Sequence, residues 1–398
     1  MPVPTDQVTS IKIGPAQTAK PIPSLTASPP PAQLPTFPPT AKSTSIVKTQ
    51  CLSVLPAAPQ FNENEGAIVL NPNLGREDNS TSFLLNLSTG AKTPLGGDRI
   101  LDPVVSPNQK FYAYHNYTKH QLMVFSADGR LQRSLPFEKE WGGFRWLDNE
   151  NLIINLPEEI DPGNFNLTFN TVIPMTRLVV NPFTGHRQIL KPDFPDIDHI
   201  NNIDITTYDP QLTRVVYLAE IKGKGMGDIL FDISNQKRLA ELPNDAYSRA
   251  PVWAPDGSKV IITTGEWAIY IITRDGLFSR IPQNPEDIEG NGYRWSPDGK
   301  KVAFWLVSGT AESVKFSLAV LDVDSKEITD YCLSASEYSI DDNLIAPPYW
   351  SSNGKHLVVE TNIQQDNITR DVYWVDLQEG LAAKIAENLT PSGWLAAP

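Results

Sequence analysis

A short repeated segment constrains the fold of this chain more than any other feature of its sequence. The segment reads WSPDGKKVAF at residues 295–304, WAPDGSKVII at 253–262 and WSSNGKHLVV at 350–359. In each copy an apolar run ends at a tryptophan, a tight turn follows, and a strand rich in β-branched residues begins. Proline presets φ for such a turn, aspartate accepts hydrogen bonds from nearby amides, and glycine adopts positive φ. The repeat therefore predicts a series of antiparallel hairpins.

Three weaker copies of the segment extend the series toward the N-terminus. They read YDPQLTRVVY at residues 208–217, WLDNENLII at 146–154 and VSPNQKFYAY at 105–114. The first residues of successive copies lie 41 to 62 positions apart, and each copy is followed by two more strands joined by a turn, as in AIYIITRDGLFSRIP at 268–282. Each repeat therefore predicts a sheet of four short antiparallel strands.

The two ends of the chain together supply a seventh sheet. GAIVL at residues 66–70 and SFLLNLSTGAKTPL at 82–95 predict three strands, but no anchoring strand precedes them. SGWLAAP at 392–398 provides the missing strand, with Trp394 placed 44 residues after Trp350. Four-stranded sheets repeated around an axis form a β-propeller. We therefore expect an all-β fold in which residues 65–398 form a seven-bladed β-propeller, with the C-terminal strand closing the first blade.

The copies WSPDGKKVAF and WAPDGSKVII resemble the repeat of TolB-like β-propellers, which is also described as WD-like. The resemblance covers about residues 65–398 and is strongest in the fifth and sixth repeats. The fourth repeat has Gln211 and Leu212 where the motif has Asp-Gly, and the second has Asn108 and Gln109. The resemblance implies a bacterial protein with a propeller fold, but it does not imply an activity because propellers have many functions.

The residues that recur among the copies of the repeat are expected to stabilise the propeller fold. The tryptophans at the anchor positions are predicted to pack between blades rather than to stack on a ligand. These residues are Trp146, Trp253, Trp295, Trp350 and Trp394. The carboxylates of Asp256 and Asp298 are predicted to hold their own turns rather than a metal ion.

The N-terminal region differs in composition from the repeats. Eleven of the 35 prolines lie within the first 40 residues, among Ser, Thr, Ala and Gln, without the period of a helix or a strand. Such a segment buries too little apolar surface to offset its backbone entropy. We expect residues 1–48 to form a disordered arm and residues 49–64 an ordered lead-in. The arm carries a net charge of +3, so the remainder carries −16.

These features bound the location and the partners of the protein. The chain contains neither a signal peptide nor an apolar run long enough for a membrane helix. A Pro/Ser/Thr-rich stalk is similar to the spacers of bacterial envelope proteins. We therefore expect an extracytoplasmic location, in the periplasm or at the cell surface, with the signal or anchor absent from this chain; a cytoplasmic location is the alternative. The net charge of −13 disfavours nucleic acid as a partner, and a monomer is expected.

The chain has two cysteines, which allow a single disulfide bond. Cys51 lies between the arm and the first blade, and Cys332 lies at the fourth strand of the sixth repeat. In an exported protein the pair would pin the lead-in across the propeller surface. The alternative is two unrelated thiols.

The sequence contains no recognisable catalytic or metal-binding motif. A Gly-x-Ser-x-Gly nucleophile elbow is absent, and the five histidines are dispersed without a metal-ligand spacing. His199 follows Asp196 and Asp198, but a solvated acidic loop is the favoured interpretation. We therefore expect neither an enzyme nor a cofactor or metal site.

A binding surface is the remaining interpretation. In propellers the loops that enter each innermost strand share one face with the loops that join the second and third strands. The insertions in these loops are at residues 157–174, 308–316 and 362–371. The candidate binding residues near the starts of the innermost strands are Trp141, Arg145, Asp204, Arg249, Tyr293, Arg294 and Tyr349. For Arg145 and Arg294, salt bridges between blades are the alternative role.

The sequence as a whole favours a non-catalytic propeller that binds a protein, peptide or glycan at the bacterial cell envelope. Two alternatives remain open at this point. One is a hydrolase or lyase whose active site is assembled from several blades at the propeller funnel. The other is the sensory module of a larger, membrane-anchored system.

Overall fold

The computed structural model describes most of the chain beyond the predicted arm. The described residues are 47–72, 82–95, 100–137, 143–156, 176–190, 202–221, 225–243, 251–264, 268–282, 287–310, 313–335, 346–361 and 370–397. The chain divides into two units, Met1–Ala41 and Lys42–Pro398, and the described residues belong to the second. Every regular element among them is a β-strand. None of the described segments is a helix of the length and apolarity that crossing a membrane requires.

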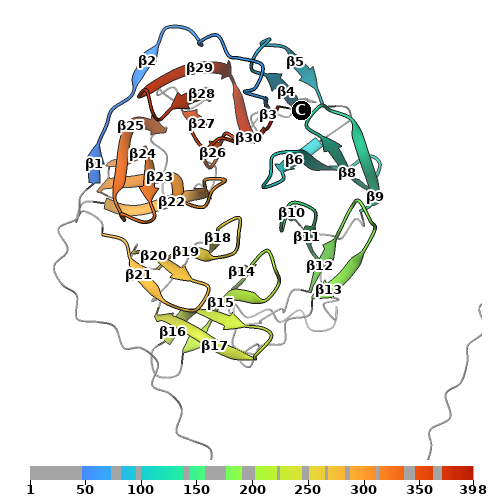
Figure 1. The fold of residues 1–398 in the computed structure, drawn as a ribbon, viewed down its shortest axis with the longest axis vertical. Helices are drawn as coiled ribbons and strands as arrows, with labels where there is room; N and C mark the ends of the chain where they lie inside the picture. Colours follow the sequence, from blue (N-terminus) through green and yellow to red (C-terminus); the bar gives the residue numbers. More distant parts are fainter. Residues whose placement is uncertain are drawn as a thin grey trace, which may run out of the picture. The chain divides into compact units, whose positions relative to one another are not determined.

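Seven antiparallel sheets of four strands are arranged around a central opening (Figure 1). The first blade contains β30 (Leu389–Leu395), β3 (Ala67–Pro72), β4 (Phe83–Asn86) and β5 (Lys92–Pro94). The second contains β6 (Ile100–Val105), β7 (Phe111–Asn116), β8 (Gln121–Ser126) and β9 (Leu131–Pro136). The third contains β10 (Phe144–Trp146), β11 (Leu152–Asn155), β12 (Arg177–Val180) and β13 (Arg187–Leu190). The fourth contains β14 (Asn202–Tyr208), β15 (Arg214–Ile221), β16 (Gly225–Asp232) and β17 (Lys237–Pro243).

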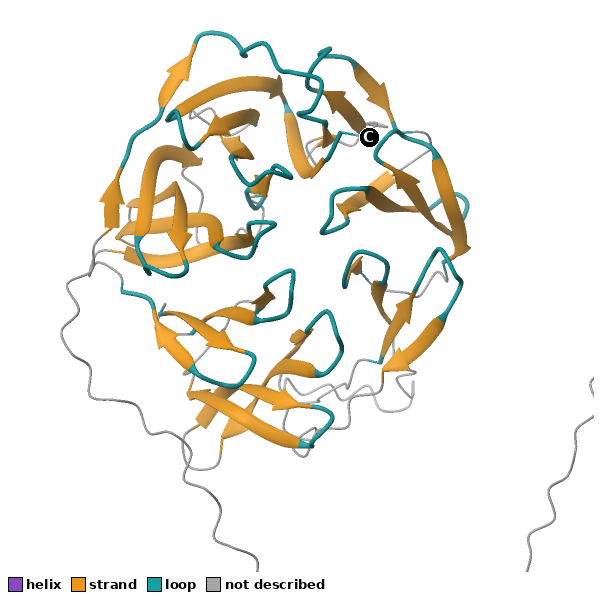
Figure 2. Ribbon diagram, viewed as in Figure 1, coloured by secondary structure: helices purple, strands orange, loops and turns teal. Residues whose placement is uncertain are grey.

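The remaining three blades carry the best-formed copies of the repeat. The fifth contains β18 (Val252–Trp253), β19 (Lys259–Thr263), β20 (Ile269–Thr273) and β21 (Phe278–Arg280). The sixth contains β22 (Asp287–Trp295), β23 (Lys301–Thr310), β24 (Ser313–Asp322) and β25 (Ile328–Ala335). The seventh contains β26 (Tyr349–Trp350), β27 (His356–Thr361), β28 (Asp371–Asp376) and β29 (Leu381–Glu387). In each blade the first-named strand is the innermost (Figures 1 and 2).

The first blade contains strands from both ends of the sequence. β30 pairs antiparallel with β3, so that Trp394 lies opposite Ile68 and Leu395 opposite Ala67. The chain therefore closes its ring with a hydrogen-bonded ladder between its last strand and the first strand of the propeller. The predicted seven-bladed fold and its closure by the C-terminal strand are confirmed.

The segment 47–55, which we call the strap, adds a fifth strand to two neighbouring blades. β1 (Val47–Thr49) pairs parallel with β25 of blade six, and β2 (Ser53–Leu55) pairs parallel with β29 of blade seven (Figure 1). Between them, Cys51 forms a disulfide bond with Cys332 of β25. β1 thus includes Val47 and Lys48, the last two residues of the predicted arm, because the edge of β25 offers them backbone partners and Val47 packs against the core of blades five and six. The rest of the arm lies outside the described residues.

The hydrophobic core lies between adjacent blades. Strand residues alternate between the two faces of each sheet, and both faces are covered by neighbours, so the second and third strands read as nearly continuous apolar runs. One cluster joins Ile261 of blade five to Trp295 and Phe304 of blade six. Another joins Trp374 of blade seven to Trp394 of blade one. The anchor tryptophans pack between blades, as predicted from the repeat.

Candidate binding site in the central channel

Each blade contributes one equivalent residue to the wall of the central channel, directly before its anchor residue. We call these seven residues the channel ring. In blade order they are Gly393, Val104, Arg145, Thr207, Val252, Arg294 and Tyr349. All seven line a cavity of about 570 Å³. This volume lies within the usual range of about 300–1,000 Å³ for small-ligand sites.

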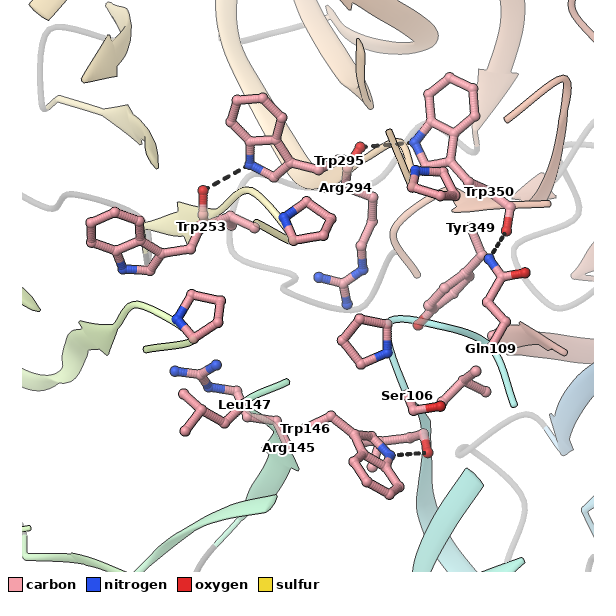
Figure 3. A pocket seen from close by; sticks show the side chains of 18 of the residues that line it. Ser106, Gln109, Arg145, Trp146, Leu147, Trp253, Arg294, Trp295, Tyr349 and Trp350 are labelled. Carbon is pink, nitrogen blue, oxygen red and sulfur yellow. Dashed lines mark hydrogen bonds between the residues drawn. The ribbon is translucent and has the colours of Figure 1, made fainter. Parts of the chain in front are cut away.

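Strand alternation explains why the residue before the anchor faces the channel. In β22, Tyr293 and Trp295 are buried between blades, and Arg294 between them is exposed. In β10, Arg145 is likewise exposed directly before the buried Trp146. Figure 3 shows both guanidinium groups pointing into the cavity from different walls.

In four blades the anchor tryptophan fixes the backbone of the neighbouring channel-ring residue. Its indole N–H donates a hydrogen bond to the carbonyl of the channel-ring residue in the preceding blade. The pairs are Trp146 to Val104 (3.1 Å), Trp253 to Thr207 (3.2 Å), Trp295 to Val252 (2.8 Å) and Trp350 to Arg294 (2.9 Å). Trp394 donates instead to the carbonyl of Glu65, at 2.7 Å. These bonds join adjacent innermost strands, so the channel wall is a rigid support for its side chains.

The cavity lies at the end of the channel where the innermost strands finish. The prolines that follow the anchors by two residues line it, namely Pro107, Pro210, Pro255 and Pro297. The sequence predicted binding at the opposite end of these strands, through loops with insertions. Of those insertions, residues 157–174 and 362–369 lie outside the described part of the chain, and 308–310 and 313–316 form parts of β23 and β24.

Two arginines determine the charge of the cavity. Arg145 and Arg294 are the charged residues among the described residues that line it, although the whole chain carries −13. Within the described residues neither guanidinium has an ion-pair partner, so the salt bridges between blades considered for them are not found there. Arg294 lies over the ring of Tyr349, with its Cζ atom 5.4 Å from the ring centroid, which is a cation–π contact.

The surroundings of Arg145 disfavour its charge. Its side chain is exposed along the channel, but it is surrounded by many protein atoms of the channel wall. The desolvation that results, together with the charges of Arg177 and Arg294, lowers the pKa of Arg145 to about 10. The guanidinium remains cationic at neutral pH, and a bound anion would relieve this unfavourable environment.

Two buried polar atoms in the cavity wall have no hydrogen-bond partner among the described residues. They are Oε1 of Gln109 and Oγ1 of Thr207, in residues that are each 8% exposed. The amide nitrogen of Gln109 donates to the carbonyl of Trp350 at 2.7 Å, which fixes the side chain. Both atoms are closed to solvent, so they lie behind the surface of the cavity wall and do not face a ligand in the cavity.

The structure brings together three of the seven predicted binding residues. Arg145, Arg294 and Tyr349 line the cavity. Tyr293 is instead buried, and its hydroxyl oxygen accepts a hydrogen bond from Thr263 at 2.9 Å, because it faces the neighbouring blade. Asp204 belongs to β14, but its side chain is outside the described part, as are Trp141 and Arg249.

Sequence reasoning missed Thr207 and Gln109. Thr207 occupies the same position in the repeat as Arg145 and Arg294, directly before an anchor residue. Reading that single position across all seven blades would have found it. Gln109 replaces the turn glycine of the second blade, and no pattern in the sequence distinguishes such a replacement from an unimportant one.

The described lining contains few groups suited to acid–base chemistry. It holds no carboxylate, histidine, lysine or cysteine side chain. Burial raises the pKa of Tyr208 to about 12, against the opposing effect of Arg177, so this phenol is neutral at physiological pH. Among the described residues no three His, Cys, Asp or Glu side chains are grouped to hold a metal ion. The arrangement is suited to binding and orienting a ligand.

No protein-family model matches the sequence, and no curated protein matches it. Solved structures with the same fold include an oligogalacturonate lyase from Vibrio parahaemolyticus, with a TM-score of 0.50 and 16% identity over 82% of this chain and 90% of that one. They also include TolB from Acinetobacter baumannii, with a TM-score of 0.41 and 15% identity over 84% of this chain and 66% of TolB. A third is the β-propeller domain of Cps50 (Swd1) from Myceliophteria thermophila, with a TM-score of 0.44 and 11% identity over 85% of this chain and 97% of that one. At these identities the likeness concerns the fold alone: this chain is a β-propeller.

Proposed function

We propose that this protein is a non-catalytic binding propeller that holds its ligand in the central cavity. The observation that carries the proposal is the composition of the cavity wall. It presents two guanidinium groups that have no ion-pair partner among the described residues, and none of the described lining side chains is an ordinary general acid or base. Such a wall supplies affinity and orientation without the groups that transfer protons.

The second candidate is a hydrolase or lyase with its active site at the same cavity. The oligogalacturonate lyase among the structural neighbours has this fold and is an enzyme. The cavity of the present chain supports that function less well, because Arg145 and Arg294 stabilise negative charge but do not accept a proton. We therefore propose a binding function, and the experiment below also measures whether the protein cleaves its ligand.

We further propose that the protein works at the bacterial cell envelope, outside the cytoplasm. The support is the bond between Cys51 and Cys332, because disulfide bonds persist in oxidising compartments and are rare in the cytosol of mesophiles. Mass spectrometry of protein taken from its native cells, alkylated before reduction, tests this proposal. Two free thiols in the native protein would contradict it.

The test of the function uses the full purified chain and a defined set of probes. These are acidic, neutral and basic peptides of equal length, and acidic and neutral oligosaccharides. Calorimetry measures binding, and mass spectrometry of the recovered probes measures cleavage. We expect at least one probe to bind in a manner that depends on the cavity and to be recovered unchanged. Cleavage that a single substitution in the cavity abolishes would overturn the proposal in favour of an enzyme.

A further inference from the structure

The arginines of the channel ring belong to blades three and six. Two blades separate these on one side of the ring and three on the other, so Arg145 and Arg294 reach the cavity from nearly opposite walls (Figure 3). Two cations that face one shared space repel each other, and nothing among the described residues neutralises them. A ligand that places negative charge between them relieves this repulsion and makes charge-assisted hydrogen bonds, which are stronger than neutral ones.

We propose that the cavity binds a short acidic peptide segment, with its side-chain carboxylates recognised by Arg145 and Arg294. The inference rests on the proposed function, since it names the ligand of the same cavity. A guanidinium group presents a planar fork of donors that matches the geometry of a carboxylate. The contact between Arg294 and the ring of Tyr349 holds one of these forks in place without using its N–H groups.

The uncharged part of the lining favours a peptide over an acidic sugar. Every ring of a sugar carries several hydroxyl groups, which lose free energy if they are buried without partners. The described lining has few side chains to receive them. The hydroxyl of Ser106 is already bonded to Asn108 and to the backbone of Phe111, and that of Ser392 accepts from Asn71 at 2.7 Å.

The uncharged side chains of the described lining are largely apolar. They include Val104, Val252, the turn prolines and the anchor tryptophans, with a few hydroxyl and amide groups among them. An extended peptide segment with one or two carboxylates and otherwise small, apolar side chains matches both the two arginines and this apolar wall.

The experiment compares three probes on the full chain by isothermal titration calorimetry. The first is a set of hexapeptides, acetylated and amidated at their ends, with two glutamates at separations of two to four residues. The second is the same set with glutamine in place of glutamate, and the third is a trimer of galacturonate. We expect at least one glutamate peptide to bind at least tenfold more tightly than its glutamine counterpart and than the galacturonate trimer, since one carboxylate–arginine contact is worth about that factor or more.

Substitutions connect the binding to the two arginines. Arg145→Gln and Arg294→Gln are each expected to weaken binding of the glutamate peptide at least tenfold. Arg145→Lys, which keeps the charge but loses the fork, is expected to lie between Arg145→Gln and the wild type. Arg130→Gln is the matched control, because Arg130 is exposed, pairs with Asp128 and does not line the cavity. Circular dichroism and thermal melting show whether each variant remains folded.

The outcomes separate this inference from the proposed function. Equal binding of glutamate and glutamine peptides, or no binding of any glutamate peptide at millimolar concentration, overturns the inference. Tighter binding of the galacturonate trimer also overturns it, but leaves the binding function in place. Loss of affinity in Arg130→Gln equal to that in Arg145→Gln would place the ligand outside the cavity and overturn both.

Discussion

The turns after the innermost strands of blades four and six have the same shape but different chemistry. In blade six, Ser296 donates to Asp298 at 2.6 Å and accepts from the amide of Lys301 at 2.9 Å, and Gly299 adopts a φ of 68°. In blade four, Asp209 replaces the serine and accepts from two backbone amides at 2.7 Å each, and Leu212 adopts a φ of 57° in the place of glycine. A non-glycine residue in this region costs about 1 kcal/mol.

The difference shows that the irregular blades use their turns to contact other blades. Asp209 forms an ion pair with Arg274 of blade five at 2.8 Å, and Gln211 donates to the carbonyl of Asp256 at 3.1 Å. In blade two, Gln109 also has positive φ, and it contacts Trp350 of blade seven. The side chains of Asp256, Asp298 and Asn353 in blades five to seven bond within their own turns, whereas Gln109 and Gln211 in blades two and four bond to another blade.

The largest expected effect concerns an anchor of a regular blade. Trp295→Ala removes a buried indole and its hydrogen bond to Val252, so we expect the free energy of unfolding to fall by about 3–5 kcal/mol. Trp295→Phe keeps much of the packing and loses the hydrogen bond, and should cost about 1–3 kcal/mol. Chemical denaturation followed by tryptophan fluorescence and circular dichroism measures both. Equal losses in the two variants would contradict the role of the indole N–H.

The second effect concerns the ion pair of an irregular blade. Arg274→Ala leaves the fully buried carboxylate of Asp209 without its cation, and we expect a loss of about 2–3 kcal/mol. The value is below that for a fully buried pair because Arg274 is partly in water. In the double variant Arg274→Ala, Asp209→Ser, the serine found in blade six removes the unpaired charge. We expect it to recover at least half of the loss. A double variant as unstable as the single one would show that the pair serves packing rather than charge.

The third effect distinguishes the backbone strain at Gln109 from the contribution of its side-chain hydrogen bond. Gln109→Ala removes the hydrogen bond to Trp350 and keeps the unfavourable φ, so it should cost about 1–2 kcal/mol. Gln109→Gly loses the same bond but relieves the backbone, and should cost roughly 1 kcal/mol less than the alanine variant in the folded state. Thermal melting ranks the variants, and hydrogen exchange of the Ala396 amide reports on the contact between blades one and two, because this amide donates to the Gln109 carbonyl. Because glycine also costs about 0.4–1 kcal/mol through the entropy of the unfolded chain, a glycine variant less stable than the alanine variant by that amount would mean that the turn is not strained.

The smallest effect is a pH dependence in blade six. The backbone amide and hydroxyl of Ser325 lower the pKa of Asp322 below its usual value near 3.8, in spite of opposing desolvation. A depressed pKa in the folded state adds stability that is present above the unfolded pKa and is lost as the pH falls through the folded one. Asp322→Asn should therefore cost up to about 1 kcal/mol at pH 7 and less near pH 3. Melting curves of the wild type and the variant at both pH values test this. A difference in stability between them that is larger at pH 3 than at pH 7 would contradict it.

Local chemistry explains how much of the fold was predictable. The Pro-Asp-Gly turns depend on a few neighbouring residues, and their regular recurrence along the chain predicted seven blades. The missing strand of the first repeat predicted the pairing of Trp394 with the first blade. The strap was not predictable in detail, because three-residue strands such as Val47–Thr49 have no period and depend on a distant edge for their partners.

The candidate site was only partly predictable for a related reason. Arg145 and Arg294 could be selected from the sequence because arginine is enriched at binding hot spots and both lie in predicted innermost strands. Thr207 and Gln109 were recognised as lining residues only from the structure of the cavity, because a threonine in a strand or a glutamine in a turn has no distinctive sequence signature. Most of the long loops on which the prediction of a binding face depended lie outside the described residues.

The bond between Cys51 and Cys332 has a topological consequence. From Cys51 the chain passes the edge of blade seven, continues through blades one to six, and returns to Cys51 through the sulfur atoms of β25. This covalent circuit runs once around the channel. If β30 detaches from β3, this covalent circuit therefore still encloses the central channel. A peptide threaded through it can leave only along the axis, and never sideways through a gap between blades.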